Sequence, residues 1–415
     1  MTYPLDDILV VSIEQAIAAP LASRHLADWG ARVIKIERPE VGDFARQYDT
    51  VMDGLSSQFI WANRSKESLA IDIKTDEGKD ALEELLKRAD VFIQNLAPGA
   101  AVRQGLDAKS IVSRHPQIIA CDISGYGSTG PYQKKKAYDL LVQCEAGFLS
   151  INGTTESPSK CGLSIVDIAT GMYALNGILM GLHQRDKTGK GMAFEVSLFD
   201  SMTEWMSYPA YYTRATKKPM PRTGARHATI APYGPFSVGD GTTVFFGIQN
   251  EREWKSFCNV VLRNDEVAID DRFKSNSLRL QHREELQGVI ESRFADLTSE
   301  AVLARLDEAA IANGRMNDVD GLINHAQVLE RGRYRSVETE AGFHDLFLPP
   351  VIIPGVEPVM GKVPAVGEHN EKILAELGFS SKKTINSTLA PGIAASPSQR
   401  WAAIGLYGRR NCDER

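Results

Sequence analysis

Residues 8–14 read ILVVSIE and residues 31–37 read ARVIKIE, and a helix pattern from Pro20 to Trp29, closed by Gly30, lies between them. Short continuous apolar runs are typical of strands buried on both faces, and a helix between two of them makes a β-α-β unit. The alternation continues to about residue 125 with SLAIDI (68–73), a helix over 76–89, VFIQN (91–95) and IIACDIS (118–124). We therefore predict an α/β fold with a doubly wound parallel sheet.

The pattern changes twice along the remaining chain. Helices are predicted over 138–150 and 167–185, and a further strand over 193–199. Residues 214–235 are rich in Pro, Gly and basic residues, which is typical of a linker or an active-site loop. The strand and helix patterns that follow, with helices over 251–262, 282–295 and 298–312, indicate a smaller, mainly helical unit. Short strands separated by Pro return over 330–365, before a helix over 370–377.

These changes predict the domain organisation. Residues 1–213 and 330–379 form the large domain, and 214–329 form a small domain with its linker. Residues 380–415 are polar and rich in Ser, Ala and Pro, so we expect a poorly ordered tail.

Composition excludes several classes of protein. The 415 residues carry 47 basic and 53 acidic side chains, a net charge of -6, so no general basic field exists to bind nucleic acid. We find no signal peptide and no apolar run of the ~18 residues that a membrane span needs, so we expect no membrane partner. Five cysteines without a C-x-x-C pair favour free thiols in a reducing cytoplasm. No H-x-x-x-H pair occurs, so we expect no metal site.

Asp167 is the most informative residue. It lies between the apolar run 163–166 and an apolar helix pattern over 168–183 that contains Gly171, Gly177 and Gly181. Each glycine inside a helix costs roughly 1 kcal/mol relative to alanine, so these positions predict a close approach of another backbone or a ligand. A carboxylate at the start of such a helix is either its N-cap or a nucleophile that accepts an acyl group. This segment alone leaves both readings open.

Basic side chains recur where loops leave strands. Gly125 to Gly130 match G-x-G-x-x-G, but Pro131 and a basic run follow where a dinucleotide fingerprint requires a helix, which disfavours a nicotinamide or flavin enzyme. The cations that follow strands or this loop are Arg38, Lys74, Arg103 and Lys134 to Lys136. Ligands of open α/β sheets bind at this edge, so together they predict a ligand with several phosphates, although each alone is more typical of solvated surface.

A second carboxylate opens the helix predicted at 138. Asp139 follows Tyr138, and it either caps that helix or lies near Asp167 and tunes the ionisation of that residue.

The chain as a whole resembles the class III CoA-transferases, which include formyl-CoA, carnitine and bile-acid CoA-transferases. The stretches that carry the resemblance span residues 8–379 in order: ARVIKIERPEVGDFAR, NRSKESLAIDIKTDEGK, NLAPGAAVRQGLD, SGYGSTGPY, AYDLL, the Asp167 helix, HQRDKTGKGMAFEVSLFD and KVPAVGEHNEKILAELGF. The resemblance implies a Rossmann-like large domain assembled from both chain ends, a smaller inserted α+β domain, and a homodimer of two interlocked subunits.

The resemblance also implies a mechanism. Asp167 is the nucleophile, which passes through an acyl anhydride and an aspartyl-CoA thioester. Coenzyme A is a substrate, and no tightly bound cofactor is implied. Gln15 faces the acyl group. The expected CoA contacts are Arg38, Lys74, Asn95, Arg103, Lys136 and Tyr138. One departure is that residues 247–253 lack the glycine-rich loop with which several members cover their intermediates.

Two other functions remain as alternatives. 2-Methylacyl-CoA racemases of the same fold have a histidine where this chain has Tyr138, and tyrosine, with a pKa near 10, is a poor base at neutral pH. An intact Asp167 argues against a non-catalytic CoA-binding protein. The resemblance is strongest to enzymes of small C4–C5 dicarboxylates: mesaconate, itaconate, citramalate and succinate. The candidates to hold the distal carboxylate, or to make structural contacts instead, are Arg46, Arg64, Arg222, Arg226 and His227.

Overall fold

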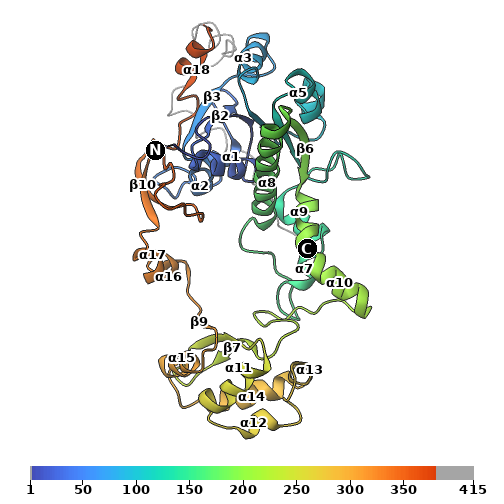
Figure 1. Ribbon diagram of the computed structural model, residues 1–415, viewed down its shortest axis with the longest axis vertical. Coiled ribbons are helices and arrows are strands. Elements are labelled where there is room, and N and C mark those ends of the chain that lie inside the picture. Colours follow the sequence, from blue (N-terminus) through green and yellow to red (C-terminus); the bar gives the residue numbers. More distant parts are fainter. Residues whose placement is uncertain (1, 380–415) are drawn as a thin grey trace, which may run out of the picture.

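A six-stranded parallel sheet organises the chain in a computed structural model that describes residues 2–379 (Figure 1). The strand order is β3-β2-β1-β4-β5-β6, so the order reverses between β1 and β4. The strands are β1 (Leu9–Ile13), β2 (Arg32–Glu37), β3 (Lys66–Ala70), β4 (Val91–Gln94), β5 (Ile119–Ser124) and β6 (Met192–Ser197). The predicted α/β class and parallel sheet are confirmed, and the predicted tail over 380–415 lies outside the described residues.

Helices cover both faces of the sheet because alternate strand residues point to opposite sides. One face packs on α1 (Ala18–Asp28), α6 (Asp139–Glu145), α8 (Ile165–Thr188) and α9 (Leu198–Trp205). The other packs on α3 (Asp76–Leu86), α4 (Ala100–Gln104), α5 (Ala108–Arg114) and the returning helix α18 (Asn370–Glu376). The predicted helix over 138–150 is broken: α7 (Phe148–Ile151) follows α6 after Gly147, whose φ of 81° ends the first helix.

Helix α8 is the central helix of the first face, and its glycines admit close neighbours. A Cβ at Gly171 would lie 2.6 Å from the Ala18 carbonyl oxygen of α1, and one at Gly177 would lie 2.3 Å from the Phe194 ring of β6. Contrary to the sequence expectation, α8 is long and apolar enough to cross a membrane by length and composition alone. Half of its most apolar window is buried, and it packs on α1, β5 and β6 as a core helix does.

A separate small body, residues 233–315, has its own apolar core around Trp254 and Phe257 (Figure 1). Its antiparallel sheet has the order β7-β8-β9. Its elements are β7 (Tyr233–Ser237), β8 (Thr243–Gly247), α11 (Glu251–Ser256), a π-helix (Phe257–Val261), α12 (Glu266–Ile269), α13 (Asn276–Gln281), α14 (Arg283–Phe294), α15 (Ser299–Glu308) and β9 (Asn313–Arg315). Helix α10 (Ser207–Thr216) leads toward it, and α16 (Val319–Ile323) and α17 (Ala326–Leu329) lead away.

The chain then returns to the edge of the large sheet. The antiparallel pair β10 (Tyr334–Thr339) and β11 (Gly342–Phe347) packs beside a 3-10 helix (Phe44–Gln47) and α2 (Ser57–Asn63). Only this pair forms strands within residues 330–365, where we expected several. Backbone bonds from Val359 to Asp28 and from His369 to Ser68 then attach the returning segment to α1 and β3.

Candidate active site

A cavity of about 730 Å³ opens at the carboxyl ends of β1 to β5. It spans the point between β1 and β4 where the strand order reverses, which is where open α/β sheets bind their ligands. Eight of the residues predicted from the sequence line it: Gln15, Arg38, Lys74, Asn95, Lys135, Lys136, Tyr138 and Asp167.

Asp167 lies in the first turn of α8, as the third residue of the helix. The N-cap position belongs to Ser164, so the reading of Asp167 as the N-cap was wrong. Among the described residues, the Asp167 carboxylate makes no hydrogen bond and no ion pair, although it lines the cavity. A carboxylate that is partly buried without a partner is unusual in a folded protein, because burial penalises the charged form.

Asp139 holds the start of α8 from another helix. One carboxylate oxygen, Oδ1, accepts from the backbone N–H groups of Val166 (2.8 Å) and Asp167 (3.3 Å). The other accepts from Gln143 Nε2 at 2.6 Å, and Gln143 Oε1 accepts from the Cys161 N–H at 3.0 Å. Asp139 is therefore not the N-cap of its own helix, a position held by Tyr138. It caps α8 instead and lies near Asp167, as the other interpretation of the sequence expected.

The same arrangement makes Asp167 hard to ionise. Burial, followed by the nearby negative charge of Asp139, raises the pKa of Asp167 to about 7. A raised pKa makes a carboxylate a stronger nucleophile once it is deprotonated, and it places the ionisation near neutral pH. The positive end of the α8 dipole faces this carboxylate and favours its charged form.

Gln15 lies in the turn between β1 and α1, and Asn95 fixes its backbone. Asn95 Oδ1 accepts from the Gln15 N–H at 2.9 Å, and Asn95 Nδ2 donates to the Gln15 carbonyl oxygen at 2.8 Å. Asn95 also lines the cavity, and its predicted contact with CoA stays a prediction.

The predicted cations fall into two groups. Arg38, Lys74 and Lys136 line the cavity, and all three are exposed residues. Arg103 is exposed on α4 and does not line the cavity, so its role as a CoA contact stays a prediction. Lys135 also lines the cavity, but its charge has partners within the chain.

Lys135 and Lys136 form a matched pair for testing CoA binding. Lys135 pairs with Glu145 and lies over the rings of Tyr132 (4.2 Å) and Tyr126 (5.5 Å), whereas Lys136 makes no salt bridge within the described residues. A charge-assisted hydrogen bond is worth about 1.5–3 kcal/mol, so Lys136→Ala should raise KM for acyl-CoA about 10-fold or more. Lys135→Ala should change it about 3-fold or less. Steady-state kinetics test this, and equal effects would contradict it.

Two of the arginines proposed for substrate make structural contacts instead. Arg46 binds both oxygens of Glu37 at 2.9 and 2.8 Å, and its guanidinium lies 3.8 Å from the centre of the Phe59 ring. Arg64 binds both oxygens of Asp28 at 2.7 and 2.8 Å. Neither lines the cavity, so the structural alternative describes both.

The basic loop at 222–227 also lies away from the cavity in this chain. Arg222 donates to the carbonyl oxygens of Thr154 and Thr155, and Arg226 pairs with Glu284 at 2.6 Å. His227 stacks on the Tyr233 ring with the ring centres 5.1 Å apart. The assignment of Arg226 and His227 to substrate stays a prediction.

Sequence reasoning missed Tyr48, which lines the cavity with Phe44. Burial, with the nearby charges of Asp43 and Asp167, raises the pKa of Tyr48 to about 12. Its hydroxyl therefore stays protonated at neutral pH and can donate a hydrogen bond to an oxygen of the substrate. The short 3-10 helix before Tyr48 has no hydrophobic periodicity that would predict it from the sequence. The available indication was that Tyr48, like Arg38, follows β2 in the chain. Residues 2–379 contain no cluster of three His, Cys, Asp or Glu side chains that could hold a metal ion.

Comparisons with known proteins agree with this geometry. The model of CoA-transferase family III matches residues 5–370. The chain is 30% identical to the succinyl-CoA:glutarate CoA-transferase of Mus musculus, over 94% of this chain and 90% of that protein. It is 31% identical to the succinate–glutarate CoA-transferase of Agrobacterium fabrum, over 94% and 98%. It is 29% identical to the succinyl-CoA:mesaconate CoA-transferase of Haloarcula hispanica, over 91% and 97%.

A solved structure supports the fold. The crystal structure of a CAIB/BAIF family protein from Brucella suis superposes with a TM-score of 0.78 at 32% identity, covering 91% of this chain and 100% of that one. The sequence matches and the shared fold lead to one conclusion. The chain belongs to CoA-transferase family III, and it is an enzyme of that family.

Proposed function

We propose that this enzyme moves CoA from an acyl-CoA donor to a small dicarboxylic acid through covalent intermediates on Asp167. An Asp167 oxygen attacks the thioester carbon, the C–S bond breaks, and CoA leaves as a thiolate. The result is a mixed anhydride. The thiolate then attacks Cγ of Asp167, which releases the donor acid and leaves an aspartyl-CoA thioester.

The second half of the reaction reverses these steps with a new acid. A carboxylate of the acceptor attacks Cγ and expels the CoA thiolate, which gives a second anhydride. The thiolate then attacks the acyl carbon of the acceptor, so that acceptor-CoA leaves and the Asp167 carboxylate is restored. No proton and no electron is gained or lost over the cycle, so the protein needs to position the groups and stabilise the charges that form.

One observation carries this proposal: the carboxylate of Asp167 has no partner in the described chain and lies in a large cavity lined by cations. A structural carboxylate at a helix start is normally paired or fully solvated, and Asp139 already performs the capping. Gln15 and Tyr48 line the same cavity and can donate hydrogen bonds to the acyl oxygens. Arg38, Lys74 and Lys136 supply the charge for the phosphates of CoA.

The relatives support a small dicarboxylic acid as the acceptor. Their names specify glutarate, mesaconate and, for a 27% identical protein of Chloroflexus aurantiacus, D-citramalate, each with succinyl-CoA. All of these acids carry a second carboxylate, whose burial without a cation would cost several kcal/mol. Arg226 and His227 remain our candidates for that contact. Tyr138, where a racemase has histidine, favours CoA transfer over racemisation.

We also propose that the active form is a homodimer with interlocked subunits. Large apolar side chains are exposed on α8 to α10, where a second subunit could cover them. They are Met172, Leu179, Met180, Trp205, Tyr208 and Tyr211.

The free cysteines among the described residues, two buried and two accessible, support the reducing cytoplasm as the location.

A panel of acceptor acids with succinyl-CoA tests the substrate class. We expect glutarate, mesaconate, citramalate and itaconate to exceed propionate and butyrate by about 10²-fold or more in kcat/KM, because acids without the distal carboxylate lose its contact with a cation. Product CoA esters are measured by mass spectrometry. Arg226→Ala should raise KM for the dicarboxylates much more than KM for succinyl-CoA, because the CoA portion supplies most of the contacts of the donor. Equal rates with butyrate and glutarate would exclude the dicarboxylate assignment.

A further inference from the structure

The turn that carries Gln15 has a strained backbone. Ala16 has a φ of 63°, in the left-handed region that costs a residue with a Cβ about 1 kcal/mol or more. Such a conformation persists where surrounding groups impose it. Asn95 holds the backbone of Gln15 on one side, and Asp43 Oδ1 accepts from the Ala16 N–H at 3.1 Å on the other.

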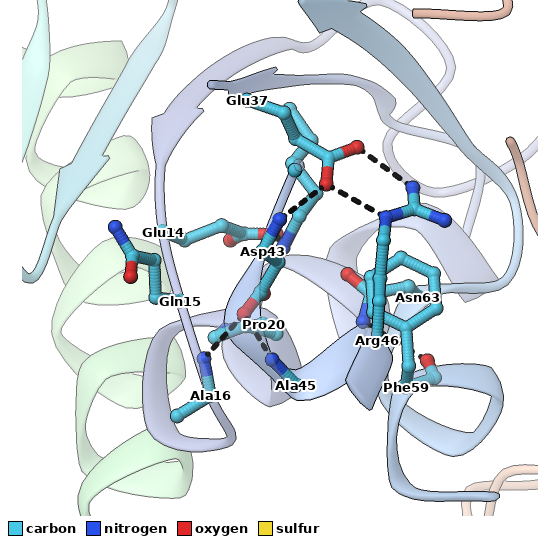
Figure 2. A network of polar contacts seen from close by, with 12 residues as sticks. Glu14, Gln15, Ala16, Pro20, Glu37, Asp43, Ala45, Arg46, Phe59 and Asn63 are labelled. Atoms are coloured by element: carbon cyan, nitrogen blue, oxygen red, sulfur yellow. Dashed lines mark hydrogen bonds and ion pairs between the residues drawn. The ribbon is translucent and has the colours of Figure 1, made fainter. Parts of the chain in front are cut away.

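Asp43 is itself fixed by a buried ion pair. It is 1% exposed, and its Oδ2 accepts from Lys35 Nζ at 2.7 Å, while its Oδ1 also accepts from the Ala45 N–H at 2.9 Å. Figure 2 shows Asp43 between the Ala16 turn and the Glu37 carboxylate, which accepts from the Asp43 N–H at 2.9 Å. Each oxygen of Asp43 therefore has a separate role, one toward the backbone and one toward Lys35.

Three carboxylates alternate with three basic side chains around this point. The side chains of Lys35 and Lys66 are both wholly buried, and both donate to Glu14 Oε1, at 3.4 and 2.7 Å. Burial lowers the pKa of Lys66 to about 7, and Glu37 pairs with Arg46. Replacing buried ion pairs by apolar groups is often neutral or stabilising, so a contribution to stability is a weak explanation for such a network. That the network holds the turn in one geometry is a stronger explanation.

The turn touches the same cavity as the reacting carboxylate. Gln15, Ala16 and Ala18 line it together with Asp167. Gly171, one turn along α8 from Asp167, lies so close to the Ala18 carbonyl oxygen that a Cβ would come within 2.6 Å. A displacement of the turn would change the distance from Gln15 to Asp167, and a misplacement of 1 Å can reduce a rate about 10²-fold.

We propose that Asp43, held by Lys35, is a positioning residue for the reaction at Asp167. It fixes the Ala16 peptide in its strained conformation and thereby places Gln15 and the start of α1 against the acyl group. This inference rests on the proposed covalent route. Asp43 acts through the backbone of the turn and need not touch the substrate.

Asparagine at position 43 tests the two roles of the carboxylate. If the asparagine oxygen accepts from the Ala16 N–H, its NH2 group faces the Lys35 ammonium. If the amide is flipped, its NH2 group faces the Ala16 N–H. In either orientation two donors face each other. We expect Asp43→Asn to slow formation of acyl-Asp167 about 10²-fold with little change in KM for acyl-CoA. Adding Lys35→Met removes the conflict, so the double variant should recover about 10-fold of that loss.

Lys66→Met is the matched control for Lys35→Met. Both remove a wholly buried lysine that donates to Glu14, but only Lys35 contacts Asp43. At matched fractions folded, measured by circular dichroism, Lys35→Met should acylate Asp167 at least about 10-fold more slowly than Lys66→Met. Because Lys35→Met leaves Asp43 able to accept from the Ala16 N–H, the Lys35→Met variant should still acylate Asp167 faster than Asp43→Asn.

Single-turnover mass spectrometry of the Asp167 peptide provides the readout. Equal losses for Lys35→Met and Lys66→Met, with no recovery in the double variant, would overturn the positioning role. Absence of any adduct on Asp167 in the unaltered enzyme would instead refute the proposed covalent route. The two failures are therefore distinguishable in one experiment.

Discussion

Asp167→Ala is expected to transfer CoA at least ~10³-fold more slowly than the unaltered enzyme, because it removes the nucleophile while the cavity remains. In the unaltered enzyme, incubation with acyl-CoA followed by hydroxylamine should convert Asp167 alone to a hydroxamate, and borohydride should reduce its thioester. Peptide mass spectrometry identifies the site. The variant should carry neither mark.

A carboxylate in the first turn of another helix serves as the control. Asp76 lies in the first turn of α3, as Asp167 does in α8, but it is exposed and outside the cavity. Asp76→Ala should keep its activity within about 2-fold and retain the label at Asp167. Near-normal turnover by Asp167→Ala would rule out nucleophilic catalysis by this residue.

The second large effect is on stability, and its sign follows from the raised pKa of Asp167. In the folded chain this pKa is about 7, whereas an unfolded aspartate titrates near 3.9. Between these values the folded state binds more protons than the unfolded state, so stability falls as pH rises through roughly 4 to 7. Asp167→Asn does not titrate. We therefore expect it to exceed the unaltered enzyme in free energy of unfolding at pH 8, by on the order of a few kcal/mol, and to lose that advantage by about pH 4.

Urea unfolding of both proteins across this pH range measures the difference. Asp240 offers a control of opposite sign, because bonds from Thr242 and Ser299 lower the pKa of that carboxyl. The contribution of Asp240 is present at high pH and is lost on acidification, so Asp240→Asn should be less stable than the unaltered enzyme at pH 8. A constant difference between Asp167→Asn and the unaltered enzyme at all pH values would show that Asp167 ionises as an ordinary aspartate.

The sheet was predictable from sequence because its strands are buried on both faces. Such strands read as unbroken apolar runs, and β1, β2, β4 and β5 all appear where those runs lie. The start of α8 was harder to predict from the sequence. Ile165 and Val166 already belong to the helix, and Ser164, a residue type preferred at N-caps, makes no side-chain capping bond there. The cap is supplied by Asp139, from a separate helix 28 residues earlier in the chain.

The candidate site was predictable only in part, for a related reason. The carboxyl ends of parallel strands share one edge, so Arg38 and Lys74, which follow neighbouring strands, could be placed at one cavity. The fates of Arg46 and Arg64 depend on Glu37 and Asp28, which folding brings to them. A sequence shows that an arginine follows a strand or helix, but it does not show which carboxylate pairs with that arginine in the folded chain.

The contact between Gly171 and Ala18 joins α8 to the start of α1 on one side of the cavity. The starts of α1 and α8 are in close contact there, so a movement of the Gln15 turn relative to Asp167 requires the two helices to separate. We therefore expect any cover over the proposed anhydride to come from chain segments across the cavity. Residues 247–253 contain a single glycine, Gly247, so we expect that cover to differ from a glycine-rich loop.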